Sequence, residues 1–237
     1  MLNKTRKLIT ATALSLSVAL LLLLFTSTQA MATVLSGDNT TAWTVDGADT
    51  VAANSVAGAT AKPIIFDLSP GGATTGSLTV TGAGTADVGA ITNIDADNGS
   101  DTADLIIGDG SAATIFIING IVTGNSTGGA STVAGNDLDI AMIGVNGGSG
   151  AQQLKFYGNV DAETNLISSG DANGINTITL GNGSLAMTFA GTISMGAVGT
   201  ASVDILTLAA GGAELSGALD LAANGGTTLV INMAAGS

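Results

Sequence analysis

Two stretches decide the fold: Leu105-Ile106-Ile107-Gly108-Asp109-Gly110-Ser111 and Ile178-Thr179-Leu180-Gly181-Asn182-Gly183-Ser184. Two glycines, a serine and a later phenylalanine (Phe116 and Phe189) recur between them at one constant offset. In each stretch a short apolar segment precedes a turn of Gly, Asn or Asp, the residues that most readily adopt positive φ. The pattern predicts units of strand, sharp turn and second strand.

Looser copies of this unit occupy residues 64–71, 138–147 and 205–212. The last apolar residues before the turns are Leu68, Ile107, Ile143, Leu180 and Leu208. We interpret their spacing as a degenerate repeat of roughly 35 residues, a period typical of solenoids and arrays. The second strands are expected at 114–118, 154–157 and 185–189.

A parallel β-solenoid accounts best for these repeats. Stacked coils pair their backbones with the coils above and below, so a narrow core of Ala, Val, Ile and Leu suffices. Apolar runs such as 105–107 and 115–118 lack strict alternation, as in strands of a tight coil or strands buried on both faces. At roughly 20–25 residues per coil, the region would form about nine coils. A β-sandwich array uses the same turns and is the alternative, but sandwiches carry more large aromatic residues.

Residues 1–30 have the order of a signal peptide. Lys4, Arg6 and Lys7 precede an apolar run that ends at Phe25, and small residues lead to a predicted cleavage site after Ala30. The strongest apolar block has about 12 residues, fewer than the roughly 20 of a spanning helix, so a signal peptide is favoured over a membrane anchor. We expect residues 31–237 to form the exported repeat region, without a transmembrane segment.

Charge and cysteine content exclude several functional classes. The chain has 18 acidic and five basic residues and a net charge of −13, and loss of residues 1–30 would leave only Lys62 and Lys155 as basic residues. Such a polyanion cannot neutralise phosphates, so we expect no nucleic-acid partner. The absence of Cys means that no disulfide supports the fold after export.

The strand-turn phrases, with Phe156-Tyr157-Gly158-Asn159-Val160, resemble the passenger regions of bacterial autotransporters and β-strand-repeat surface proteins, including the surface-layer antigens of rickettsia-like bacteria. The resemblance covers most of residues 35–235. It implies export to the outer-membrane surface, a β-helical stalk and a role in adhesion or a surface coat. No alternating lipid-facing strands with aromatic girdles follow, so we expect a truncated passenger or a chain held at the surface by another route.

Few residues could carry catalysis. There is no His or Cys, and Arg is absent after residue 30, which leaves carboxylates, lysines and Tyr157 for acid–base chemistry. Asp137 and Asp139 alternate along one strand in the manner of a glycosidase pair, although solvated charges are the favoured interpretation. We therefore predict that the chain is not an enzyme, with a β-helical carbohydrate-active enzyme as the alternative.

The loop at residues 95–104 is the candidate metal site. Its oxygen-rich side chains suit calcium, and the candidate ligands are Asp95, Asp97, Asp101 and Asp104. The loop is not an EF-hand, because Gly99 falls one position early and Ile106 replaces the bidentate Glu. A solvated acidic turn is favoured, so we predict no cofactor, with structural calcium as the alternative.

The sequence thus predicts a non-enzymatic, secreted bacterial surface protein that serves as a structural coat or adhesin-like module. Its expected location is the cell surface or the extracellular medium. Its expected partners are host or neighbouring-cell surface molecules, or other copies of the chain bound through coil ends with unpaired strand edges.

Overall fold

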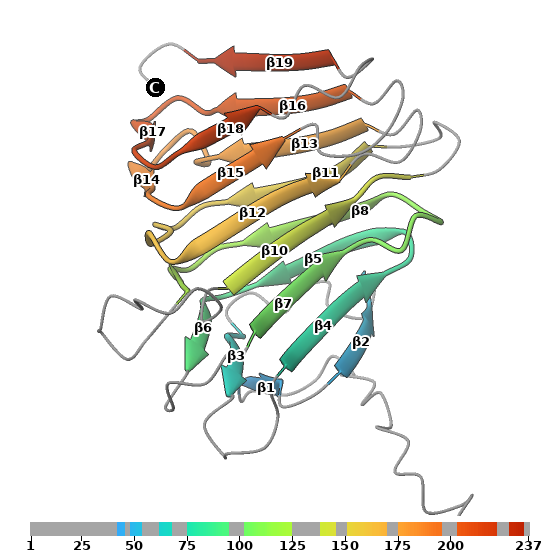
Figure 1. Ribbon diagram of the computed structural model, residues 1–237. Coiled ribbons are helices and arrows are strands. Elements are labelled where there is room, and N and C mark those ends of the chain that lie inside the picture. The colour runs from blue at the N-terminus through green and yellow to red at the C-terminus, as the bar shows by residue number, and fades with distance from the viewer. Residues whose placement is uncertain are drawn as a thin grey trace, which may run out of the picture. The chain divides into compact units, whose positions relative to one another are not determined.

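The computed structural model describes residues 42–45, 48–53, 62–67, 75–94, 102–124, 138–145, 151–169, 175–195, 203–221 and 228–234. These residues belong to one unit, 32–237, whereas the predicted signal peptide lies outside the described residues. Every regular element within the described ranges is a β-strand, and every strand pair is parallel (Figure 1). The predicted all-β, parallel β-solenoid is confirmed.

The strands form three sheets, which we call A, B and C. Sheet A has seven strands, β2 (Ala48–Ala52), β4 (Thr75–Thr81), β7 (Thr102–Ile107), β10 (Leu138–Ile143), β12 (Thr164–Ser169), β15 (Thr192–Met195) and β18 (Leu219–Leu221). Sheet C has six strands, β5 (Gly84–Val88), β8 (Thr114–Ile118), β11 (Ala151–Phe156), β13 (Ile175–Leu180), β16 (Val203–Leu208) and β19 (Thr228–Met233).

Sheet B has two parts, β1 (Trp43–Val45), β3 (Ile64–Asp67), β6 (Ile91–Ile94) and β9 (Val122–Thr123), then β14 (Met187–Phe189) and β17 (Ala213–Leu215). Val160 joins the two parts, because it bridges to Val122 on one side and to Phe189 on the other. The chain visits B, A and C in turn, as in β3, β4 and β5, and each such circuit is one coil. Figure 1 shows the coils stacked from β2 to β19.

Most coils are shorter than the predicted repeat of roughly 35 residues and longer than the predicted coil of roughly 20–25 residues. Residues paired across neighbouring coils are 24 to 30 positions apart at most levels, for example Leu138 and Thr164. The step between Ile91 and Val122 is 31, and the steps of 35 to 38, such as that between Ile115 and Gln153, contain residues 125–137. Because sheet A has seven described strands, the expectation of about nine coils is wrong.

The two stretches that decide the fold occupy different corners of the coil. Residues 105–111 connect β7 in sheet A to β8 in sheet C, whereas residues 178–184 connect β13 in sheet C to β14 in sheet B. The constant offset between the two stretches therefore does not superimpose equivalent levels. What recurs in the sequence is the strand-turn-strand corner and not the whole coil.

The core consists of columns of side chains, each contributed by successive coils. One column of sheet A is fully buried over five levels and is formed by Leu78, Leu105, Ile140, Leu166 and Ile193. Sheet C contributes Val88, Ile118, Phe156 and Leu180 in the same manner. Burial alternates along most of the described strands, so even the apolar run 115–118 has one buried face and one partly exposed face. These strands are not buried on both faces.

Glycines with positive φ form the corners. Gly108 and Gly181 have φ of 90° and 85°, and their N–H groups donate to the preceding coil, at Val80 O and Phe156 O, over 2.8 Å each. The next residue closes the turn in both cases. Asp109 Oδ1 accepts from the N–H of Ser111 at 2.9 Å, and Asn182 Oδ1 accepts from the N–H of Ser184 at the same distance. Backbone pairing thus continues past the end of the strand.

Two corner glycines should differ in their tolerance of Ala. Gly183 has φ of 82° and open space around an added Cβ, so Gly183→Ala should cost about 1–2 kcal/mol of unfolding free energy from the left-handed backbone alone. At Gly108 an added Cβ would overlap Gln152 Nε2 and would lie 2.9 Å from Ile143 O.

Gln152 is fully buried and cannot move away freely, because its Oε1 accepts from Thr114 N and its Nε2 donates to Ala112 O. Loss of these bonds should make Gly108→Ala about 2 kcal/mol worse than Gly183→Ala. Urea unfolding of the two variants measures the difference. Equal losses would contradict this account of the corner.

Candidate functional site

The structure describes only part of the candidate sites taken from the sequence. Asp95, Asp97, Asp101 and Asp137 lie outside the described residues, so the calcium loop stays a prediction. Asp104 and Asp139 are described, and both lie within strands, on β7 and β10, and not in turns. Among the described residues there is no group of three or more side chains of His, Cys, Asp or Glu that could hold a metal ion.

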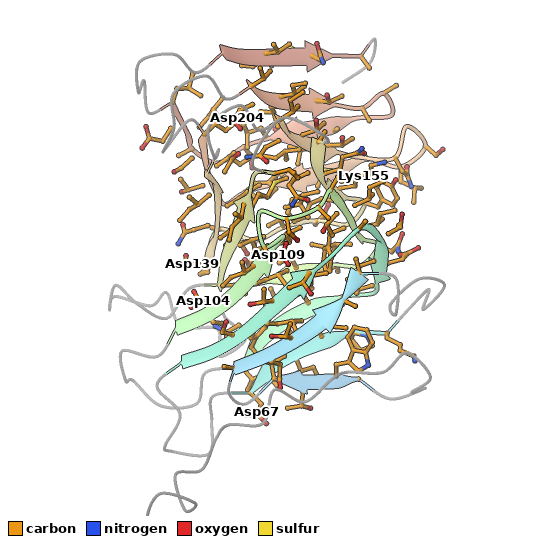
Figure 2. The ribbon with its side chains drawn as sticks, turned by 90° about the vertical axis from the view of Figure 1, so that its right-hand side faces the viewer. Asp67, Asp104, Asp109, Asp139, Lys155 and Asp204 are labelled. Atoms are coloured by element: carbon orange, nitrogen blue, oxygen red, sulfur yellow. The ribbon has the colours of Figure 1, made fainter. Side chains whose placement is uncertain are left out.

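Asp104 and Asp139 are direct neighbours on the outer face of sheet A. They are register partners on adjacent strands, and Asn165 is the partner of Asp139 on the next strand. Asn165 Nδ2 donates to Asp139 Oδ1 at 3.1 Å. All three side chains are partly exposed and form an outward column, in which both carboxylates are close to one another (Figure 2).

The proximity of the two carboxylates changes the acidity of Asp104. Partial burial raises the pKa of the Asp104 carboxyl, and the neighbouring Asp139 carboxylate raises it further. By contrast, hydrogen bonds from the hydroxyl and backbone N–H of Ser111 lower the pKa of Asp109 in the adjoining corner. Two neighbouring carboxyls, one of them with a raised pKa, are an arrangement that acid–base chemistry uses, and they are also a site of simple charge repulsion.

Sequence reasoning paired Asp139 with Asp137 and missed Asp104 as its neighbour across coils. The two residues are 35 positions apart, and their pairing depends on a coil length that the sequence does not display. The one sequence feature that could have linked Asp104 to Asp139 is their similar setting, since each aspartate stands between apolar residues near the start of a strand. That signal alone does not distinguish an outward from an inward aspartate.

Replacement of Asp104 by Asn should stabilise the fold at neutral pH. Because the folded-state pKa of Asp104 is raised, its ionisation favours the unfolded chain, and stability falls as pH rises through the folded-state pKa. Asp104→Asn should raise the unfolding free energy at pH 7 by about 0.2–1 kcal/mol, the scale of a like-charge cross-strand pair. The gain should vanish at acidic pH, where the wild-type carboxyl is protonated in both states.

Asp220→Asn is the matched control for this prediction. It removes the same charge from the outer face of sheet A, but the register partner of Asp220 on β15 is Ser194. Its effect should stay within about 0.5 kcal/mol at either pH. Urea titrations of both variants at neutral and acidic pH give the comparison. An equal gain from both variants would assign the effect to net charge and not to the pair.

A second polar group lies inside the solenoid. Ser168 on β12, Asn176 on β13 and Asp204 on β16 are fully buried, and the last two are register partners (Figure 2 labels Asp204). Ser168 Oγ donates to Asp204 Oδ1 and accepts from Asn176 Nδ2, both at 2.8 Å. The other oxygens, Asn176 Oδ1 and Asp204 Oδ2, have no hydrogen-bond partner among the described residues.

This buried cluster has an excess of acceptors. A buried acceptor without a donor costs about 1–3 kcal/mol. Asp204→Asn keeps the shape and supplies an N–H donor, so it should raise the unfolding free energy by about 1 kcal/mol or more at pH 7. Asn176→Asp removes the donor to Ser168 and adds a second carboxylate, and it should cost about 3–5 kcal/mol. Chemical denaturation compares the two, and a comparable loss from Asp204→Asn would show that the fold requires a negative charge at this position.

The outer face of sheet C differs from the acidic column of sheet A. On β13 and β16 every outward position carries an uncharged, β-branched and partly exposed side chain: Ile175, Thr177, Thr179, Val203, Ile205 and Thr207. We call these six residues the β-branched face. They are register partners in three columns, and Lys155 on β11 marks the border of the face as the partner of Thr179.

Comparisons with known proteins add no assignment. No protein-family model, no curated protein and no solved structure matches the chain. Among the residues that the structure describes, no helix has the length and apolar character required to cross a membrane.

Proposed function

We propose that the chain is an exported, non-enzymatic surface protein of a bacterium, which acts as a structural coat or adhesin-like module through the β-branched face. The single observation that supports this proposal is the lack of charge on that face. The whole chain has 18 acidic residues, yet two adjacent strands present only Ile, Val and Thr outward.

An uncharged face on a polyanion favours contact at that face. Elsewhere the acidic side chains repel other anionic surfaces and keep the chain in solution. On the β-branched face an approaching surface meets methyl groups and hydroxyls, which gain from burial and require no desolvation of charge. Contiguous exposed apolar surface on a soluble protein commonly marks a site of interaction.

The face also has a regular spacing. Thr177 is the register partner of Ile205, and Thr179 is the partner of Thr207. Neighbouring strands of a sheet lie about 4.7–4.9 Å apart, so the face offers two similar rows of β-branched side chains at that interval. A repeated row suits a repetitive partner, such as another β-sheet or a host or neighbouring-cell surface.

The cellular part of the proposal depends on residues 1–30. Their basic start, apolar run and small residues before Ala30 support export, and the resemblance of the strand-turn phrases to autotransporter passengers supports a location at the outer-membrane surface.

Lysines placed on the β-branched face test the function. The paired residues Thr177 and Ile205 are changed to Lys together in the full chain, produced in an exporting bacterium. We expect the cell-associated, protease-accessible fraction to fall about tenfold, which corresponds to about 1.4 kcal/mol of binding free energy. The reason is that two buried contacts would then contain desolvated ammonium groups.

The matched control is Ile167→Lys with Ser194→Lys. These two residues are register partners with partly exposed side chains on the outer face of sheet A, so the control replaces one Ile and one hydroxyl residue and adds the same charge. It should retain the wild-type distribution. An equal release of both variants, or an unchanged distribution of the first, would contradict a role for the β-branched face.

The alternative function is that of a β-helical carbohydrate-active enzyme, and the Asp104–Asp139 pair is the observation that favours it. The two carboxyls are side by side on neighbouring strands, which lie about 4.7–4.9 Å apart, and retaining glycosidases use two carboxyl groups about 5–5.5 Å apart. Turnover on a panel of polysaccharides that is lost in Asp139→Asn would establish the enzyme and overturn the first proposal.

A further inference from the structure

The last coil exposes side chains that point to the core. Ile231 and Met233 on β19 are register partners of Leu206 and Leu208, which are buried, yet they are 47% and 69% exposed. Leu221 on β18 is the partner of the buried Met195 and is 48% exposed. These side chains continue the core columns and have no described coil above them, as Figure 1 shows for β19.

The two edges of β19 differ among the described residues. The strand pairs with β16 on one side, and no described strand pairs with its other side. Proteins usually protect such edges with charges, Pro, a bulge or a covering segment. Residues 228–233 contain no charged residue and no Pro, and the strand is six residues long. Within the described ranges, this edge therefore combines backbone groups that no strand pairs with exposed apolar side chains.

The core side chains of the first described coil are covered. Trp43 and Val45 on β1 and Val51 on β2 lie in this coil, and their exposed fractions are 3%, 0% and 1%. Within the described part of the chain, the C-terminal coil is thus the end that offers core side chains to a partner. We call a coil with exposed core side chains an open end and a coil with buried core side chains a closed end. Contact between an open and a closed end buries apolar surface of the open end alone, whereas contact between two open ends buries the exposed core side chains of both copies.

We propose that two copies of the chain associate end to end through their C-terminal coils, with β19 pairing antiparallel to β19 of the second copy. Such a contact is isologous, so both open ends are used and assembly stops at the dimer. This inference is independent of the proposed function, because it concerns the end of the coil stack and not the β-branched face.

Side chains of β19 point alternately to the core and to solvent, and this alternation limits which residues of the two copies can lie opposite one another. Opposed residues of an antiparallel pair have side chains on the same face, so each core-facing residue must oppose another core-facing residue. A two-fold axis at Ile231 meets this condition and pairs residues 229–233 of each copy. It places Ile231 opposite Ile231 of the second copy and brings both exposed residues, Ile231 and Met233, into the contact.

Electrostatics gives the dimer a salt dependence. Each copy carries a net charge of −13, so long-range repulsion opposes association, while β19 itself is uncharged. Added salt screens that repulsion, with a Debye length that falls from about 30 Å at 0.01 M to about 8 Å at 0.15 M. The dimer should therefore become more stable as salt increases.

Sedimentation equilibrium of the full chain tests the dimer. The wild type should approach twice the monomer mass as concentration and salt rise. Ile231→Glu with Met233→Glu should raise the dimer dissociation constant at least about 100-fold, because two carboxylates per copy would be buried in the contact. The control is Leu185→Glu, which charges a side chain that is 63% exposed in the corner before β14. It should leave the dissociation constant unchanged.

Three results would overturn the proposal: a monomer at every concentration, a dimer that the double variant leaves intact, or open-ended oligomers. Thermal melts by circular dichroism confirm that the variants remain folded. Because both substituted side chains are about half exposed or more, the monomer should keep a cooperative melt.

A disulfide tests the register itself. The chain has no Cys, so Ile231→Cys introduces a single thiol per copy. Opposed residues in antiparallel strands have Cα atoms about 4.5–5.5 Å apart, within the range of disulfides. With oxidised glutathione as the oxidant, Ile231→Cys should form a covalent dimer much faster than the control Ile121→Cys, which is 59% exposed and distant in sequence. Equal rates would contradict the antiparallel contact at Ile231.

Discussion

The in-register backbone pairing of each coil with the next is the constraint on which the structure depends. It places inward side chains of successive coils in columns. The surroundings of each such side chain are therefore set by its register partners in the coil above and the coil below. A column of Leu and Ile, such as the one from Leu78 to Ile193, fills the narrow core without large aromatic side chains. The same rule places Asp104 beside Asp139, so the pairing that stabilises the core also creates the acidic column.

Much of the fold could be predicted because its signals are local. The turn at Gly108 needs a residue that tolerates positive φ, and the strand 114–118 follows it as expected. The length of the coil could not be predicted in this way. The strongest sequence repeat links corners between different pairs of sheets, so its offset does not measure the distance between stacked levels.

The candidate sites show the same limit. Asp104 and Asp204 both stand between apolar residues near the start of a strand, yet the first side chain is partly exposed on the outer face and the second is fully buried. Their orientation depends on the register with the neighbouring coil, where Asp204 follows Asn176 and Asp104 follows Ser77. A shift of one residue reverses the face of a strand, so local sequence cannot decide it.

The coils from β10 to β19 have similar lengths, with 24 to 28 positions between register partners on their strands, and this regularity has a mechanical consequence. Each coil contacts only its neighbours, so force applied to the C-terminus would detach β19 and the coils beneath it one after another. A detached coil of about 27 residues lengthens the chain by at most about 89–97 Å, since an extended residue spans about 3.3–3.6 Å. The described stack from β10 to β19 would yield in nearly even steps under tension, and relaxed coils could rewind onto the remaining stack.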